Sequence, residues 1–307
     1  MNTEQTYRFD NKVVVVTGAG IGLGRSHARL FASLGAKVVA NDLGVNRDGT
    51  TGGNGTGDSS QIDITVAEIN DNGGQAVANY DSVEHGERII EQALDVYGRV
   101  DVVINNAGII RDKSFHKMSL EDWQLVHKVH LEGAFKVTQA AWPHFRHQQY
   151  GRVLCTASAA GLYGNFGQAN YGAAKLGLYG LVRTLAVEGA SNNIHANTIA
   201  PMLDSRMLEG LMPDEYRKQL KPELVSPLAA FLCHEQCEES GSLYEVGAGW
   251  YAKVRWQRSE GVGLPAGEPV TVADIAEHWQ AINSFDDAHY PNDTIGAGMH
   301  MLNNLQR

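Results

Sequence analysis

"KVVVVTGAGIGLGRSHARLFASLGA", residues 12–36, joins a run of β-branched residues to a helix-like segment through closely spaced glycines. Four valines followed by a threonine are typical of a buried strand, and the segment from Leu23 has the apolar spacing of a helix that ends at Gly35. Glycines in such a turn let the backbone approach a ligand closely, and the amino end of the following helix attracts an anion. The stretch therefore predicts the first strand, turn and helix of an α/β domain that binds a phosphate-containing ligand.

Strand-like runs of the same kind recur along the chain, each separated from the next by a segment of helical length. Apolar strands that alternate with helices indicate a parallel sheet covered on both faces. The right-handed crossover rule then favours a doubly wound, Rossmann-type α/β fold, for which we expect seven strands. The later runs include KVVANDLG (37–44), QAVANYDS (75–82), VDVVINNAG (100–108), GRVLCTAS (151–158) and IHANTIAP (194–201).

Two segments interrupt this alternation. "GVNRDGTTGGNGTGDSS", residues 44–60, is too polar and glycine-rich to build a core, so it predicts a long loop after the second strand. From about residue 250 the chain continues into a tail whose final helical piece is "TVADIAEHWQAINSF", residues 271–285. We therefore expect a Rossmann-type domain over residues 1–250 and a C-terminal extension over 251–307, packed on that domain or on a neighbouring subunit.

Composition excludes several classes of protein. The chain has 307 residues, 43% of them hydrophobic, and a formal net charge of −10, which argues against a general nucleic-acid binder. It has neither an apolar leader nor a membrane-length apolar run, so we expect a cytoplasmic protein that does not bind membranes. Its three cysteines suit a reducing compartment. Cys233, His234 and Cys237 lack a fourth ligand at matching spacing, and we predict no metal site.

The glycine-rich turn and the strand ends that follow it predict a dinucleotide site. Asp42 ends the second strand roughly 20 residues after the turn, where a carboxylate would accept hydrogen bonds from ribose hydroxyls and repel a 2′-phosphate. NAD is therefore favoured, although Arg25 and Arg47 keep NADP open. Asn105 and Asn106 have an alternative role as simple turn residues. The predicted contacts from these segments are Gly18, Gly20, Ile21, Gly22, Gly24, Asp42, Asp81, Ser82, Asn106, Ala107 and Gly108.

Tyr171 and Lys175 lie four residues apart in an apolar segment, so a helix places the phenol and the ammonium side by side. Lowering the pKa of a tyrosine by roughly 3 units needs about 4 kcal/mol, which Lys175 and a positively charged nicotinamide ring would supply together. Tyr171 then becomes a general acid/base. Ser158 ends the preceding strand and would hold the same substrate oxygen, its alternative role being a helix cap.

These motifs resemble the short-chain dehydrogenase/reductase family in order and spacing, over residues of about 10 to 250. The resemblance rests on TGAGIGLG, Asp42, NNAG, Ser158, YGAAK and IHANTIAP. It implies hydride transfer between a nicotinamide cofactor and an alcohol or ketone, with Tyr171 as acid/base and Ser158 orienting the substrate. It also implies that Lys175 holds the nicotinamide ribose and that Pro201 lies beside the cofactor. His130 stands where many members have an asparagine in the proton relay.

A closer resemblance is to the (3R)-hydroxyacyl-CoA dehydrogenases of this family, carried by "VHKVHLEGAF", "YGNFGQANYGAAKLGL" and "KVRWQRS". This closer resemblance includes the histidine at position 130, so it implies that His130 is characteristic of the subfamily. It implies NAD-dependent oxidation of a (3R)-hydroxyacyl-CoA in the β-oxidation of fatty or sterol and bile-acid side chains, by a stand-alone bacterial enzyme. Separately, the helix-like segment LGLYGLVRTLAVEG, residues 176–189, is apolar on more than one face, so we expect a homodimer. Basic residues would bind the CoA phosphates unless they are ordinary surface or subunit-contact groups. The candidates are Arg111, Lys113, Lys117, Lys253, Arg255 and Arg258.

Two other functions stay open. The first is a dehydrogenase of free hydroxysteroids or other secondary alcohols, which would turn over substrates that lack CoA. The second is a non-catalytic NAD-binding sensor or scaffold, in which we would expect the catalytic residues to be eroded. Ser158, Tyr171 and Lys175 are all present.

Overall fold

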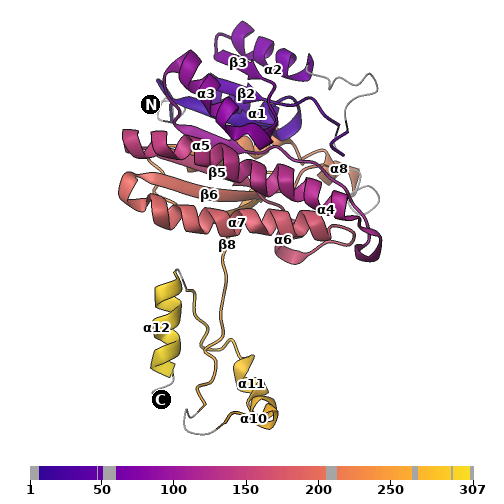
Figure 1. Cartoon of the computed structure of the whole chain (residues 1–307), viewed down its shortest axis with the longest axis vertical. Coiled ribbons are helices and arrows are strands. Elements are labelled where there is room, and N and C mark those ends of the chain that lie inside the picture. Colours follow the sequence, from indigo (N-terminus) through magenta and orange to yellow (C-terminus); the bar gives the residue numbers. More distant parts are fainter. Residues whose placement is uncertain are drawn as a thin grey trace. The chain divides into compact units, whose positions relative to one another are not determined.

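The valine run forms β1 (Val13–Thr17) at the centre of a sheet with the strand order β3-β2-β1-β4-β5-β6-β7-β8 (Figure 1). This computed structural model describes residues 7–46, 48–50, 60–204, 213–264, 269–291 and 293–304. The chain divides into two compact units, Met1–Lys253 and Val254–Arg307. The other strands are β2 (Lys37–Asn41), β3 (Gln75–Asn79), β4 (Val102–Asn105), β5 (Gly151–Thr156), β6 (Ile194–Pro201), β7 (Leu243–Gly247) and β8 (Trp250–Val254).

The predicted doubly wound fold is confirmed by the pairing of the strands. The six registers from β3 through to β7 are all parallel. The order reverses between β1 and β4, and ligands of such sheets bind at the carboxyl ends of the strands beside this point. The sheet has one strand more than predicted, since β8 begins at Trp250, the last residue of the predicted domain, and continues to Val254 in the predicted extension. Ala248 and Gly249 connect it to β7 in a two-residue turn with φ values of 51° and 80°.

Alternate residues of β1 point into two separate hydrophobic clusters, as the period of two in a strand requires. Val14 and Val16 pack with residues of α1 and α9, whereas Val13 and Val15 pack with residues of α3, α5 and α7. Both faces of the sheet are therefore covered. The helices of the first unit are α1 (Gly22–Ser33), α2 (Ser60–Asp71), α3 (Gly86–Tyr97), α4 (Leu120–His127), α5 (Gly133–Gln148), α6 (Ala159–Tyr163), α7 (Ala169–Gly189), α8 (Asp214–Arg217) and α9 (Ser226–Cys233).

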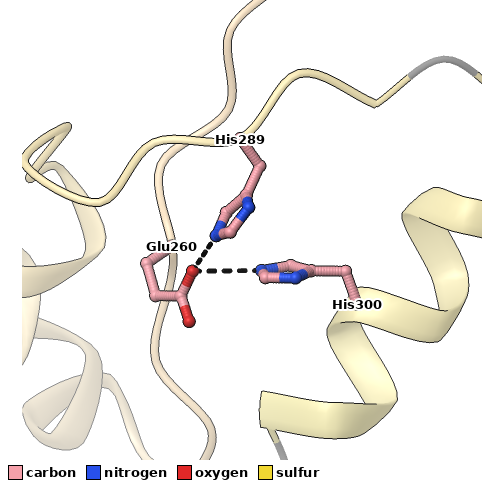
Figure 2. A group of neighbouring side chains, drawn as sticks. All are labelled: Glu260, His289 and His300. Atoms are coloured by element: carbon pink, nitrogen blue, oxygen red, sulfur yellow. Dashed lines mark hydrogen bonds and ion pairs between the residues drawn. The ribbon is translucent and has the colours of Figure 1, made fainter.

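The second unit is more broken than the sequence suggested. The predicted final helix is divided at His278 into α10 (Val272–Glu277) and α11 (Trp279–Ile282), and a third helix, α12 (Thr294–Asn304), was not foreseen. An antiparallel bridge joins Arg258 to His289, beside Glu260 (Figure 2). In the first unit, residues 47 and 51–59 of the predicted loop and residues 205–212 lie outside the described ranges. No helix among the described residues is long and apolar enough to cross a membrane.

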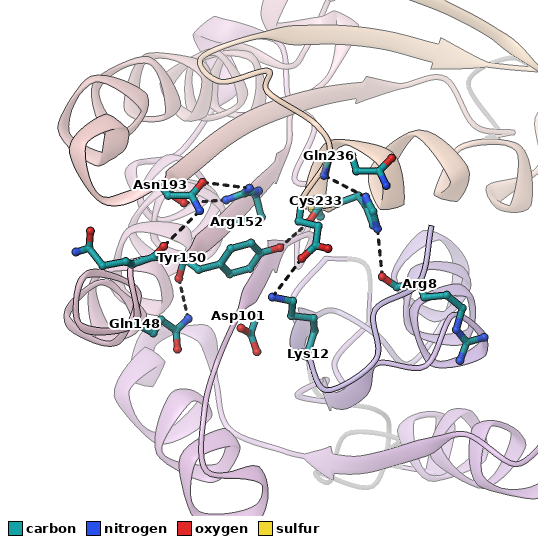
Figure 3. A network of polar contacts seen from close by, with 12 residues as sticks. Arg8, Lys12, Asp101, Gln148, Tyr150, Arg152, Asn193, Cys233 and Gln236 are labelled. Atoms are coloured by element: carbon teal, nitrogen blue, oxygen red, sulfur yellow. Dashed lines mark hydrogen bonds and ion pairs between the residues drawn. The ribbon is translucent and has the colours of Figure 1, made fainter. Parts of the chain in front are cut away.

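A network of polar side chains lies at the amino ends of the central strands, opposite the expected ligand edge (Figure 3). Arg152, only 1% exposed, donates to the carbonyls of Gly151 and Asn193 at 2.9 and 2.8 Å. Its guanidinium lies 4.4 Å from the centre of the Tyr150 ring. Nearby, the buried carboxylate of Asp101 accepts from the Val13 amide at 2.8 Å. The Asp101 contact joins the start of β1 to that of β4, and the Arg152 contact joins the start of β5 to that of β6.

Replacing Asp101 by alanine is expected to lower the free energy of unfolding by about 2–4 kcal/mol, because it leaves the Val13 amide without its acceptor and removes the partner of Arg99. Urea unfolding of the cofactor-free chain measures the effect. Asp10→Ala is the matched control, since Asp10 forms an exposed pair with Arg8 and should leave the midpoint nearly unchanged. Equal midpoints for the Asp101 variant and the wild type would contradict the importance of this network.

Candidate active site

The glycine-rich turn between β1 and α1 is packed tightly on its inner side. A Cβ on Gly24 would lie 2.0 Å from the carbonyl oxygen of Gly18, which itself has a φ of 66°. A Cβ on Gly22, by contrast, would meet nothing within 4 Å. The N-cap residue Ile21 makes no side-chain cap, so the first-turn amides of α1 are open to an anion. The turn therefore fits the pyrophosphate of a dinucleotide.

Asp42 lies directly against this turn. Its carboxylate accepts from the Gly20 amide and from the Gly44 amide, both at 2.8 Å. Arg25 also faces the turn, because its Nε donates to the Gly20 carbonyl at 2.9 Å and its guanidinium contacts Gln61. Asp42 thus lies at the carboxyl end of β2, while Arg25 donates to the Gly20 carbonyl and to the Gln61 side chain. Arg47, the other cation that kept NADP open, lies outside the described ranges.

The strand ends next to the turn are joined to it by hydrogen bonds. Asn106 donates to the carbonyls of Thr17 and Gly18 at 3.1 and 3.2 Å. The hydroxyl of Thr17 in turn accepts from the amides of Asn106 and Ala107 at 3.0 and 3.1 Å. Thr17 was missed as a site residue, although a hydroxyl at the end of the first strand was visible in the sequence. Asn106 therefore links the end of β4 to the end of β1.

Asp81 and Ser82 follow β3 on the same edge of the sheet. The Asp81 carboxylate accepts from Asn79 at 3.0 Å and lies 3.7 Å from Arg88. Ser82 accepts from the Glu84 amide and so caps the short helix Val83–His85. Pro201 ends β6, also at a carboxyl end, in register with Val246 of β7. The structure thus brings the predicted dinucleotide contacts to one edge of the sheet.

Lys175 lies one turn after Tyr171 on α7, with its Nζ 5.5 Å from the centre of the phenol ring. Nζ donates to the carbonyl oxygen of Thr156 at the end of β5, at 2.5 Å. Burial lowers the pKa of Lys175 to about 7, because the charged form loses its hydration. The ammonium is thus held in place next to the phenol but is easily deprotonated in the absence of a ligand.

Tyr171 does not have the lowered pKa that the sequence suggested for the complete site. In the chain alone its pKa is raised, chiefly because the phenol is buried. The hydroxyl of Ser158 acts against this shift and the charge of Asp112 adds to it. Ser158 also accepts from the Ala160 amide at 3.2 Å, so it is both the cap of α6 and a neighbour of the phenol. Lysine alone therefore does not produce the phenolate.

His130 lies in a π-helical turn, Lys128–Glu132, between α4 and α5. Its ring meets that of Tyr171 edge-on, with 5.2 Å between the ring centres. Nε2 lies 2.7 Å from the carbonyl oxygen of Ile109, while the buried Nδ1 has no hydrogen-bond partner among the described residues. Burial, and next the charge of Lys175, hold the pKa of His130 well below its usual range. The imidazole is therefore neutral and next to the phenol.

The sequence analysis did not identify several residues that position Tyr171. Asn170 donates to the carbonyl of Arg111 at 3.0 Å and accepts from the Tyr171 amide at 2.7 Å. Gln168 donates to the carboxylate of Asp112, whose pKa is raised by burial. The sequence signal was the run of amides in "GNFGQANYG", residues 164–172, which we associated only with the tyrosine and lysine. These contacts fix the start of α7 against the segment that follows NNAG.

Exposed aromatic side chains surround this part of the molecule. The Lys113 amide donates to the Gly167 carbonyl at 2.9 Å, which joins the segments that carry Phe115 and Phe166. These two phenylalanines are 79% and 89% exposed. Tyr163, at the end of α6, is 67% exposed and donates to Glu245 at 2.6 Å. Tyr163 and Phe166 thus expose apolar surface from the end of α6 to the start of α7, and Phe115 exposes it on the segment joined to that of Phe166.

Several of the basic residues predicted to contact CoA have protein partners. Arg111 pairs with Asp122 at 3.0 Å, and Lys253 pairs with Glu239 at 2.7 Å. In the second unit, Arg255 stacks on Tyr290 at 3.6 Å and Arg258 donates to a carbonyl of α12. The assignment of the CoA phosphates therefore stays a prediction.

His234, which the sequence analysis considered and rejected as a zinc ligand, contacts the carbonyl oxygen of Arg8 at 3.2 Å.

Comparison with known proteins identifies the family to which this site belongs. The sequence matches the short chain dehydrogenase family over residues 12–215. The chain belongs to this family. This short-chain dehydrogenase is 56% identical to peroxisomal multifunctional enzyme type 2 of Mus musculus, over 92% of its own length and 38% of the mouse protein. It is 53% identical to the peroxisomal hydratase-dehydrogenase-epimerase of Neurospora crassa, over 92% of its length and 31% of that protein.

A solved structure extends the similarity of this short-chain dehydrogenase through both of its units. Full-length peroxisomal multifunctional enzyme type 2 from Drosophila melanogaster has a TM-score of 0.83 and 43% identity, covering 97% of the chain and 50% of the Drosophila chain. The chain thus spans between about a third and a half of the length of these relatives. The family predicted from the motifs is confirmed.

Proposed function

We propose that this short-chain dehydrogenase oxidises a (3R)-3-hydroxyacyl-CoA to the 3-ketoacyl-CoA with NAD, in the β-oxidation of fatty or sterol and bile-acid side chains. The observation that carries the proposal is the 53% identity to a hydratase-dehydrogenase-epimerase. A hydratase that adds water across a conjugated double bond produces a hydroxyl at the β-carbon, and that hydroxyl is the group a dehydrogenase in the same protein would oxidise. The exposed aromatic side chains Phe115 and Phe166 suit an apolar acyl group.

The glycine-rich turn would hold the pyrophosphate, and Asp42 the adenosine ribose. Gly18, Gly20, Ile21, Gly22 and Gly24 form the turn. Asp81, Ser82, Asn106, Ala107, Gly108 and Pro201 would line the rest of the cofactor site along the carboxyl edge of the sheet. When bound, NAD would supply the acceptor for the hydride that leaves the carbon of the alcohol.

Tyr171 takes the proton of the substrate hydroxyl, and Ser158 hydrogen-bonds the same oxygen. Because burial raises the pKa of Tyr171, an added positive charge is needed to favour the phenolate. Lys175, 5.5 Å from the ring centre, supplies part of that charge, and its Nζ would also hold the nicotinamide ribose. His130 lies against the phenol, and its Nδ1 has no hydrogen-bond partner among the described residues, so this nitrogen could hydrogen-bond a group bound in the site. Because its pKa is held well below the usual range, the imidazole would act there in its neutral form.

The carboxylate of Asp42 supports NAD over NADP, and so does the hydrogen bond by which Arg25 is already engaged with the Gly20 carbonyl. Asp42→Asn is expected to raise the KM for NAD and to lower the NAD-over-NADP preference, each by about 10–100-fold, because a charge-assisted hydrogen bond is worth roughly 1.5–3 kcal/mol. Steady-state rates with both cofactors give these ratios. The asparagine keeps an acceptor for the Gly20 amide, so the fold should be retained. An unchanged cofactor preference would contradict the ribose contact.

A homodimer in the cytoplasm completes the proposal. One side of α7 exposes the uncharged residues Ala173, Gly180, Thr184 and Val187, the last with 71% of its surface accessible. Such a stripe on the longest helix is suited to packing against its own copy in a two-fold dimer. Sedimentation of the full chain over a range of concentrations would test the association directly.

The decisive experiment is the initial rate of NAD reduction with matched (3R)- and (3S)-hydroxyacyl-CoA of medium chain length. The free hydroxy acid, a free hydroxysteroid and a hydroxylated steroid-CoA are measured in parallel. We expect turnover of the 3R thioester to exceed that of the 3S thioester and of the free acid by at least about 100-fold. Comparable rates with free alcohols would replace the proposal with a general alcohol or hydroxysteroid dehydrogenase. NAD binding without any turnover would indicate a sensor.

A further inference from the structure

The C-terminal unit, Val254–Arg307, has little to hold it together. None of its described residues is buried, and apolar side chains such as Val272 and Ile295 are 87% and 78% exposed. Units this small rarely gain enough free energy from a hydrophobic core alone, and many depend on a disulfide or a metal ion. All three cysteines lie in the first unit, so a disulfide within this one is excluded.

Three potential metal ligands converge inside this unit (Figure 2). The Oε2 of Glu260 contacts Nε2 of His289 and lies 3.1 Å from Nε2 of His300. The two imidazole rings are 3.6 Å apart between centres. One ligand atom from each of the three residues lies within 4.8 Å of the others. This is the separation expected of groups able to bind one shared ion.

The three residues come from separate segments of the chain. Glu260 follows β8, His289 precedes α12, and His300 lies within α12. The backbones of Arg258 and His289 exchange hydrogen bonds of 2.9 and 2.8 Å, which fixes the first two segments side by side. An ion bound here would join α12 to that pair of segments. Nε2 of His300 is buried and, apart from its ion-pair contact with Glu260, has no hydrogen-bond partner among the described residues. Once it loses its proton, its lone pair could bind an ion held by the same carboxylate.

We propose that Glu260, His289 and His300 bind one divalent transition-metal ion of the zinc class, which cross-links the C-terminal unit. Two imidazole nitrogens and one carboxylate oxygen form a donor set typical of Zn²⁺, with the remaining position left for water. The order of divalent affinities favours Zn²⁺, Cu²⁺ and Ni²⁺ for such a set, while Mg²⁺ and Ca²⁺ prefer oxygen ligands alone. The prediction of no metal site, made from the cysteines, did not consider this tail.

The test uses the full chain freed of metal with a chelator. Calorimetric titration with Zn²⁺ should give one site per chain with a Kd in the micromolar range or tighter, and Mg²⁺ should give none. His289→Gln and His300→Gln should each weaken Zn²⁺ binding by more than about 100-fold. His278→Gln is the matched control, because His278 belongs to the same unit but contacts the carbonyl of Asp274. Zinc affinity equal to wild type in the His300 variant would overturn the proposal.

A second measurement keeps the proposal testable if the variants fail to fold. Co²⁺ added to the wild-type chain should produce visible absorption bands of a four- or five-coordinate ion, and Zn²⁺ should displace them. Zn²⁺ should also slow proteolytic cleavage within Val254–Arg307 several-fold while leaving cleavage of the first unit unchanged. Absence of the bands, or binding without protection of the unit, would contradict the cross-link. Neither readout depends on the dehydrogenase activity.

Discussion

Turnover of the alcohol is expected to fall by about 10²–10⁴-fold in Tyr171→Phe, because the substrate hydroxyl then has no group to take its proton. The phenylalanine ring should occupy the same place, because the His130 ring packs edge-on with the aromatic ring of Tyr171, and this contact does not need the hydroxyl. In the wild type, the rate of oxidation should increase with pH. In the chain without cofactor the raised pKa of Tyr171 keeps the phenol protonated near neutrality. Lys175 and bound NAD would act against this shift, and the active phenolate becomes more abundant as the pH rises. Rate profiles from neutral to alkaline pH measure both effects.

Tyr179→Phe is the matched control for this loss. Tyr179 is a buried tyrosine two turns further along α7, and its loss should leave turnover within a few-fold of wild type. NADH binding, followed by fluorescence, should be nearly equal in the wild type and both variants. Wild-type turnover in Tyr171→Phe would assign the proton transfer to another group.

Lys175→Met is expected to lower turnover by at least about 100-fold and yet to stabilise the cofactor-free chain. The reason is the buried ammonium. Burial lowers the pKa of Lys175 from 10.5 to about 7, so the unfolded chain binds a proton more readily than the folded one. The buried Lys175 therefore lowers the free energy of unfolding by its full amount below about pH 7, and this effect disappears as the pH rises toward 10.5. After allowing for the lost hydrogen bond to Thr156, the variant should gain roughly 1–3 kcal/mol at pH 6 and progressively less at alkaline pH.

Urea unfolding of the cofactor-free chain at pH 6 and at pH 9 measures this difference. Lys128→Met provides the control, because Lys128 is an exposed partner of Glu84 and its replacement should give no gain that fades with pH. A Lys175 variant that is less stable than wild type at pH 6 would mean that the ammonium is better solvated than its burial implies.

The parallel, doubly wound sheet was predictable from the sequence, because strand runs alternate with helical segments, and short motifs were enough to propose where a dinucleotide binds. A valine run, a glycine turn and a carboxylate at the end of the second strand identify one edge of a parallel sheet. Tyr171 and Lys175 were proposed from their helical spacing together with the position of Ser158 thirteen residues earlier. β8 was harder to predict, since its residues are half-exposed and its turn places a non-glycine residue, Ala248, at a positive φ.

Properties that depend on burial or on distant contacts were not predictable. The raised pKa of Tyr171 follows from the groups packed around it, which belong to segments far apart in the chain. Asp112 influences the phenol only because Gln168 and Asn170 attach the start of α7 to its segment. Glu260 is 29 residues from His289 in sequence, so no local pattern announces their convergence.

The packing of His130 against Gly108 has a consequence for how this protein can vary. A Cβ at position 108 would lie 2.2 Å from Cε1 of the imidazole, so the two positions share one volume. A library that varies residue 108 alone should return only glycine among folded clones. A library that varies both positions together should recover alanine or serine at 108 when a smaller residue replaces the histidine. Residues 108 and 130 are therefore expected to change together. A histidine introduced at the position of His130 in a related protein would also need a glycine at the position of Gly108.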